Sequence, residues 1–162
     1  MKKQWLYLSP LAAMLFVTSK CDDDVVSTIE LPAVIQNYLN NNYSGYEVEE
    51  SERDSLCNDT AVYDIELEGP KDKEVELTFD TEGNLLFTET EIKSGDLPTA
   101  VTAGINAIYT DAVIKEAVRL DLAGGGAQYE VELKIGPTLL EVLFAADGSV
   151  ICEQASDDDD GE

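Results

Sequence analysis

The chain has 162 residues, of which 44% are hydrophobic and 27% charged, a balance typical of a folded protein. Thirty-four acidic residues against ten basic ones give a net charge of −24, which argues against a surface for nucleic acid. The sequence contains no histidine, which excludes Ser-His and Cys-His catalytic pairs and histidine metal sites. No carboxylate pair stands out by its spacing. We therefore predict that the protein is not an enzyme and has no catalytic residues, no metal-ligand set and no cofactor.

The first twenty residues have the pattern of a secretory signal. Lys2 and Lys3 precede an apolar run, 5–17, that is shorter than the roughly 20 residues needed to span a bilayer. Residues 18–21 then resemble a bacterial lipobox with Cys21 as the lipidated N-terminus, although Lys20 stands where a small residue is preferred. We predict an exported protein, either a lipoprotein of the outer membrane or cell surface or, with an ordinary cleaved signal, a periplasmic protein. Without those twenty residues, seven bases and 34 acids leave a net charge of −27.

The remainder of the chain contains one sequence pattern twice. Several residues of the first copy recur 66 positions later: Leu31-Pro32, Tyr43, Tyr63 and Leu67 recur as Leu97-Pro98, Tyr109, Tyr129 and Leu133. Two more, Phe79 and Gly83, return 65 positions later as Phe144 and Gly148. Such a period indicates one supersecondary unit used twice. The predicted organisation is a signal peptide at 1–20, an acidic linker at 21–27, repeats at 28–93 and 94–154, and a disordered acidic tail at 155–162.

Each repeat opens with apolar residues at helical spacing, over 31–43 and again over 97–109. The spacing then changes to strict alternation, which predicts four antiparallel strands per repeat. Gly83 and Gly148 fall between strands and fit the positive φ of hairpin turns. The predicted fold is α+β: a tandem repeat of one helix followed by a four-stranded antiparallel meander, with the helices packed on one face of the sheets. The alternation places Phe87 and Cys152 on the helix-covered face, and it treats Ile114, Val118, Leu120 and Leu122 as one core-facing set.

The motifs also resemble those of a known family. The Leu-Pro start, the Tyr at the helix end, the Tyr-x-hydrophobic-x-Leu strand and the hairpin 79–85 (Phe-Asp-x-x-Gly-Asn-Leu) are similar to the PepSY-like domain, also described as beta-lactamase-inhibitor-protein-like. The resemblance covers about 28–153, and the second copy departs from it at Ala145 and Ser149. It implies two tandem copies in a bacterial lipoprotein that acts by binding, with inhibition of a secreted or periplasmic hydrolase as the specific activity.

Acidic side chains share the strand face that points away from the helices. They form the candidate binding face: Asp64, Glu66, Glu68, Glu74, Glu76, Glu130, Glu132 and Glu141. Like charges on neighbouring strands repel by up to about 1 kcal/mol for a directly opposed pair. We expect an acidic half in the first repeat and a more apolar half in the second, and a protein partner with a basic, partly apolar surface. The alternatives are loose binding of Ca²⁺ by the same carboxylates and a passive structural lipoprotein.

Two cysteines remain if Cys21 is lipidated. Cys57 and Cys152 either form a disulfide, as thiols outside the cytoplasm often do, or stay free with Cys152 buried as a small hydrophobe. The sequence leaves both alternatives open.

Overall fold

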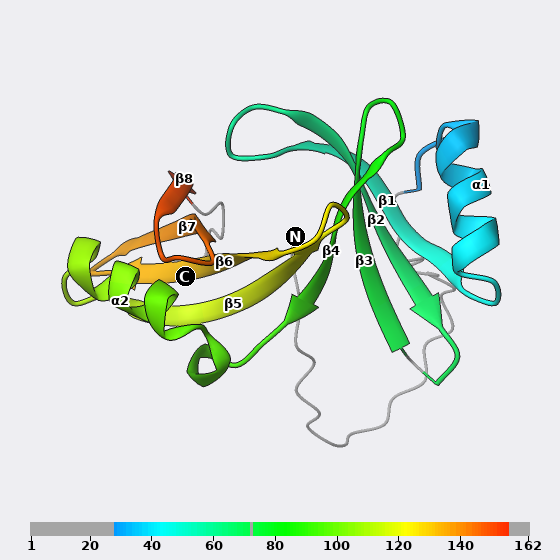
Figure 1. Ribbon diagram of the computed structural model, residues 1–162. Coiled ribbons are helices and arrows are strands. Elements are labelled where there is room, and N and C mark those ends of the chain that lie inside the picture. The colour runs from blue at the N-terminus through cyan, green and yellow to red at the C-terminus, as the bar shows by residue number, and fades with distance from the viewer. Residues whose placement is uncertain (1–27, 72, 156–162) are drawn as a thin grey trace, which may run out of the picture.

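The computed structural model describes residues 28–71 and 73–155, so the predicted signal segment, the predicted lipidation site Cys21 and residues 156–162 lie outside the described residues. A helix and four strands occur twice in succession, with a short 3₁₀ turn between them (Figure 1). The elements are α1 (Ala33–Asn42), β1 (Glu47–Ser55), β2 (Ala61–Gly69), β3 (Lys73–Asp80), β4 (Leu85–Glu91), η1 (Ser94–Asp96), α2 (Thr99–Ile108), β5 (Val113–Leu122), β6 (Ala127–Ile135), β7 (Thr138–Ala145) and β8 (Val150–Ala155).

The eight strands form one antiparallel sheet in the order of the chain, from β1 to β8. The two halves are joined because β4 pairs with β5, with Phe87 opposite Leu122 and Glu91 opposite Val118. Figure 1 shows the halves inclined to each other, with α1 outside the first and α2 outside the second. The face opposite the helices, which we call the concave face, is therefore shared by both repeats.

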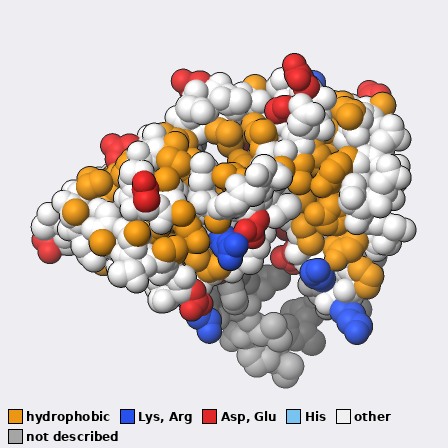
Figure 2. All heavy atoms as spheres, viewed as in Figure 1, with side chains coloured by type: hydrophobic (Ala, Val, Ile, Leu, Met, Phe, Trp, Pro, Cys, Tyr) orange, Lys and Arg blue, Asp and Glu red, His pale blue; other side chains and the backbone are white. Residues whose placement is uncertain are grey.

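Each helix covers the strands that follow it. Ile35 and Leu39 of α1 pack with Ile65 and Phe79, and Val101 and Ile105 of α2 form the same kind of cluster with the second set of strands. The most deeply buried side chains belong to these two clusters, for example Phe79 and Phe144, both 0% exposed. Space-filling Figure 2 shows hydrophobic side chains gathered over both halves of the molecule, with acidic and a few basic side chains between them.

The predicted assignment of several side chains to a face of the sheet is wrong, because the strand pairing is irregular. The register shifts between Thr78 and Phe79 and between Leu143 and Phe144, so that Phe87 and Cys152 lie on the concave face and not beneath a helix. A third shift, at Lys115, divides the set predicted from the alternation in β5. Ile114 faces α2, whereas the concave face receives Val118, Leu120 and Leu122. One extra residue in a strand reverses the side-chain parity of everything beyond it.

The second helix lies unusually close to a turn. A Cβ added at Gly104 would lie 2.2 Å from the carbonyl oxygen of Gly148, and one added at Gly148 would lie 2.1 Å from that of Ala100. In the first repeat the position of Gly104 is occupied by Tyr38, whose ring packs edge-on against Phe79 at 5.3 Å. Glycine costs a helix interior about 1 kcal/mol relative to alanine, and here that cost permits backbone contact between α2 and the β7–β8 turn.

We predict that Gly104→Ala destabilises the protein although alanine favours helix formation. The added methyl group meets backbone rather than a side chain that can move, and overpacking of this kind costs roughly 1–3 kcal/mol. Chemical denaturation of Gly104→Ala measures the change. Gly124→Ala is the matched control because a Cβ at Gly124 would have nothing within 4 Å. An increase in stability for Gly104→Ala would contradict the close approach.

Candidate functional site: the concave face

All eight residues of the predicted binding face lie on the concave face, as the pairing of β2 with β3 and of β6 with β7 shows. Most of them are partly buried, and only two are exposed, Glu68 and Glu74. The acidic face is thus not the simple solvent-facing surface that alternation suggests. Its carboxylates are partly withdrawn from water.

The acidic side chains are ordered in two rows that run across the strands. In the first repeat Glu50, Glu66, Glu76 and Glu89 stand opposite one another on β1 to β4. The second repeat places Glu116, Glu132, Glu141 and Gln154 in the equivalent row on β5 to β8. The two rows therefore have the same layout except at the last position, where Glu89 is matched by an amide.

Sequence reasoning missed Glu50, Glu89 and Glu116. Each lies beyond a register shift within its own strand, so strict alternation from the core-facing residues before the shift assigned it to the wrong face. The adjacent apolar pair Leu85-Leu86 interrupts the alternation and is the signal that could have located the shift in β4.

Apolar side chains occupy the middle of the concave face. Val62, Phe87 and Leu120 are 3%, 7% and 2% exposed and belong to neither of the helix-covered clusters. Leu120 stands opposite Glu89, and Leu143 stands opposite Glu130. The carboxylates nearest the centre are therefore flanked by hydrocarbon, which disfavours their charged form.

The pKa values of three central carboxyls respond to this environment. Burial, with the repulsion of Glu76 and Asp64 added, raises the pKa of Glu89 to about 9. Burial is also the main cause that raises the pKa of Glu130 to about 7, and charges from both repeats contribute, including Glu141 and Asp64. The pKa of Asp64 rises to about 6, again chiefly through burial. The central carboxyls therefore resist ionisation more than exposed carboxyls do.

A buried threonine lies between two of these carboxyls. Thr78 is 2% exposed, and its hydroxyl oxygen lies 3.3 Å from Asp64 Oδ1 and 3.4 Å from Glu89 Oε1. Carboxylate oxygens of Asp64, Glu76 and Glu89 lie within 4.8 Å of one another. Three ionised groups at this spacing repel strongly, and protonation of one of them relieves the repulsion.

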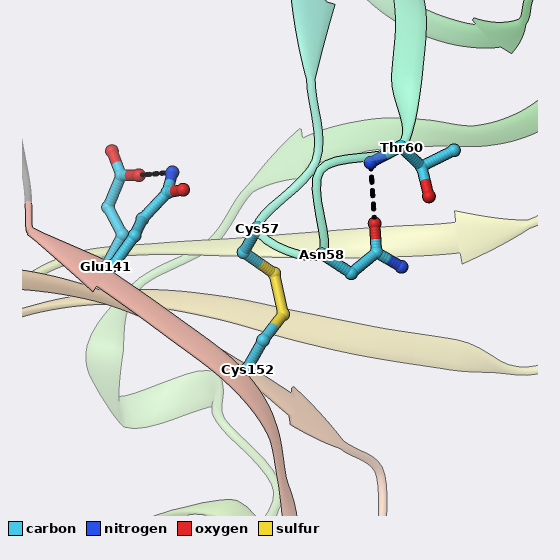
Figure 3. Close-up of a disulfide and its surroundings, with 6 residues drawn as sticks. Cys57, Asn58, Thr60, Glu141 and Cys152 are labelled. Carbon is cyan, nitrogen blue, oxygen red and sulfur yellow. Dashed lines mark hydrogen bonds between the residues drawn. A yellow bond between two sulfur atoms is a disulfide. The ribbon is translucent and has the colours of Figure 1, made fainter.

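A disulfide joins the two repeats across this face. Cys57, in the turn between β1 and β2, is bonded to Cys152 of β8, 95 residues further along the chain (Figure 3). Cys152 stands opposite Leu143, beside the acidic row in which Gln154 donates a 2.7 Å hydrogen bond to Glu141. The turn at Cys57 is itself ordered by the Asn58 side chain, which accepts a 3.0 Å hydrogen bond from the Thr60 amide. Of the two alternatives for these cysteines, the structure contains the disulfide. Its formation is possible because Cys152 projects from the concave face and not into a helix-covered core.

A family model described as "Putative beta-lactamase-inhibitor-like, PepSY-like" matches the chain twice, over residues 17–87 and 87–151. The chain belongs to this PepSY-like family. The family is described by likeness to an inhibitor, and its description names no enzymatic activity. None of the curated proteins matches the chain.

Solved structures from Bacteroides share the fold of this PepSY-like chain. A BLIP-like protein from Bacteroides fragilis is 24% identical, with a TM-score of 0.54 over 86% of this chain and 96% of that one. A DUF2874 family protein from Bacteroides uniformis is 16% identical, with a TM-score of 0.55 over 78% of this chain and 90% of that one. A protein from Bacteroides eggerthii described as "putative periplasmic" is 15% identical, with a TM-score of 0.55 over 78% and 89%. None of the helices among the described residues has the length and apolar character required to cross a bilayer.

We predict that removal of the disulfide strongly destabilises the PepSY-like body. Cross-linking residues 95 apart stabilises by about 4–5 kcal/mol in the chain-entropy model. Urea denaturation of Cys57→Ser/Cys152→Ser should show a loss approaching that size, and wild type treated with a phosphine reductant should behave like the variant. Equal midpoints for oxidised and reduced wild type would show that the disulfide contributes nothing to stability.

We also predict that stability falls as the pH rises from 5 to 9. Asp64, Glu130 and Glu89 have raised pKa values in the folded state. Their protons are retained by the folded state and lost by the unfolded one in this range, so the folded state is penalised as pH rises. Asp80 and Asp147, whose pKa values are lowered by hydrogen bonds from Asn84 and Ser149, change stability only at lower pH.

The expected decrease in melting temperature between pH 5 and pH 9 is at least roughly 5–10 °C, because Glu130 alone, with a pKa of about 7, contributes about two pKa units of about 1.4 kcal/mol each, and each kcal/mol corresponds to a few degrees. Thermal scans at constant ionic strength in EDTA measure it. Glu130→Gln should reduce the slope, while the exposed Glu74→Gln should leave it nearly unchanged. A melting temperature that rises over this range would contradict the assignment.

Proposed function

We propose that the protein is a non-catalytic extracytoplasmic binding protein that receives a basic, partly apolar protein surface on its concave face. The observation that carries the proposal is the layout of this face, in which acidic rows from both repeats lie beside partly exposed apolar side chains such as Val118 and Leu143, above a centre where Phe87 and Leu120 are buried. Such a mixture complements a partner whose lysines or arginines surround an apolar patch.

The net charge supports the same kind of partner. At −24 for the whole chain, the protein attracts basic surfaces and repels nucleic acid and anionic lipid headgroups. The description of the family makes a secreted or periplasmic hydrolase the first class of partner to test, with inhibition as the outcome of binding. We place the protein in the bacterial envelope, held by a lipid at Cys21 or free in the periplasm.

Loose association of Ca²⁺ with the acidic face as a whole is the second candidate. It is favoured by the crowding of carboxylates on adjacent strands, where a bound cation would relieve repulsion. A ligand that binds only the folded state raises the melting temperature, so thermal scans with and without millimolar Ca²⁺ distinguish the two functions. A passive structural lipoprotein would show neither a Ca²⁺-dependent shift nor a partner.

The proposal predicts that neutralising the acidic row weakens partner capture. Protein crosslinked in its native cell envelope is recovered, and bound proteins are quantified by mass spectrometry for wild type and for Glu66→Gln/Glu76→Gln. A loss of tenfold or more in the recovered partner is expected, since two interface charges each contribute on the order of 1 kcal/mol.

The matched control is Glu30→Gln/Glu82→Gln, which removes the same charge from exposed positions outside the acidic rows. It should retain the partner. Full retention of the partner by Glu66→Gln/Glu76→Gln would rule out docking on the concave face. If the control retains the partner as wild type does and the double variant loses it, the purified partner is tested for enzymatic inhibition.

A further inference from the structure

One position distinguishes the two acidic rows. In the second repeat Gln154 ends the row, and its amide donates to Glu141 Oε2 at 2.7 Å. In the first repeat the equivalent position is Glu89, which stands opposite Glu76. A glutamate can replace the donating amide only if it carries a proton, because an ionised carboxylate accepts hydrogen bonds and donates none.

Both contacts of Thr78 can be hydrogen bonds only when one of the two carboxyls that it approaches carries a proton. The Thr78 hydroxyl has one proton and lies within hydrogen-bonding distance of both Asp64 and Glu89. It can donate to only one of them. The second contact is a hydrogen bond only when that carboxyl is protonated and donates to the hydroxyl oxygen.

The surroundings of Glu89 oppose its ionisation from every side. On β3 it meets Glu76, on β2 Asp64, and on β5 the apolar Leu120, while Glu130 of β6 also repels it. Further acidic groups, Glu52 and Asp54 of β1, lie beside Asp64. Lys134 is the basic residue on the same face of β6. It stands opposite Leu139, four residues further along the strand than Glu130, which pairs with Val118.

We propose that Glu89 keeps its proton at neutral pH and serves as the hydrogen-bond donor of the first acidic row, which makes the concave face a pH-sensitive surface. Below the midpoint of its titration, Glu89 is uncharged and can donate a hydrogen bond within the group of Glu76, Thr78 and Asp64, which then carries one negative charge fewer. Above it, an additional charge appears beside Leu120 and adds to the repulsion within the row. Burial raises the pKa of Glu89 to about 9, which is consistent with this geometry.

The consequence for docking rests on the proposed function. A lysine or arginine brought against Glu89 favours its ionised form, so association would release a proton and the affinity of a basic partner would rise with pH. The same dependence should be absent in Glu89→Gln, whose side chain has no proton to release.

The titration of Glu89 tests the proposal directly. Carboxyl ¹³C NMR of the full oxidised chain in EDTA, with Glu89→Gln used for assignment, should give a midpoint above pH 7 for Glu89. The exposed Glu82 in the β3–β4 turn serves as the internal reference. A midpoint for Glu89 between 4 and 5 would overturn the proposal.

Thermal stability provides the second measurement. Glu89→Gln should melt close to wild type at pH 6 and above it at pH 10, where only wild type carries the extra charge. An equal offset at both pH values would overturn the proposal. Failure to find any partner would count against docking and not against the proton on Glu89, which the titration decides independently.

Discussion

The pairing of β4 with β5 is the contact on which the architecture depends. Without it, two helix-covered meanders would each have a free sheet edge, and a unit of about 60 residues is marginally stable alone. With it, the eight strands become one sheet whose concave face draws residues from both repeats. The acidic rows, the apolar centre and the disulfide between Cys57 and Cys152 all exist as shared features because this pair of strands is joined.

Bringing the repeats together also creates an electrostatic problem. Carboxylates that would be hydrated on a flat, isolated meander are partly buried where the two halves incline toward each other, and charges of the first repeat reach Glu130 in the second. The amide of Gln154 and the hydroxyl of Thr78 offset part of the repulsion, and the raised pKa values of the central carboxyls favour their uncharged form. The covalent connection at Cys57 and Cys152 holds the halves in place whatever the state of these groups.

Partial burial of the carboxyls on the concave face lowers the stability of the protein. A face that served solubility alone would not require buried carboxyls. Exposed acids elsewhere, such as Glu47 and Glu82, supply negative charge without burial. The partly buried acids border Phe87 and Leu120 and thereby define a patch of mixed chemistry. This arrangement is the reason that we propose a binding role for the concave face.

Local periodicity and short motifs were enough to predict the repeat, the two helices, the eight strands, the turns at Gly83 and Gly148, and the family. They also placed Asp64 and Glu130 on the right face. The positions of Phe87, Cys152, Val118 and Glu89 depend on strand pairing, since a single extra residue in a strand reverses the parity of all that follow. The state of Glu89 was likewise beyond the sequence, because its environment is built by strands from both halves of the chain.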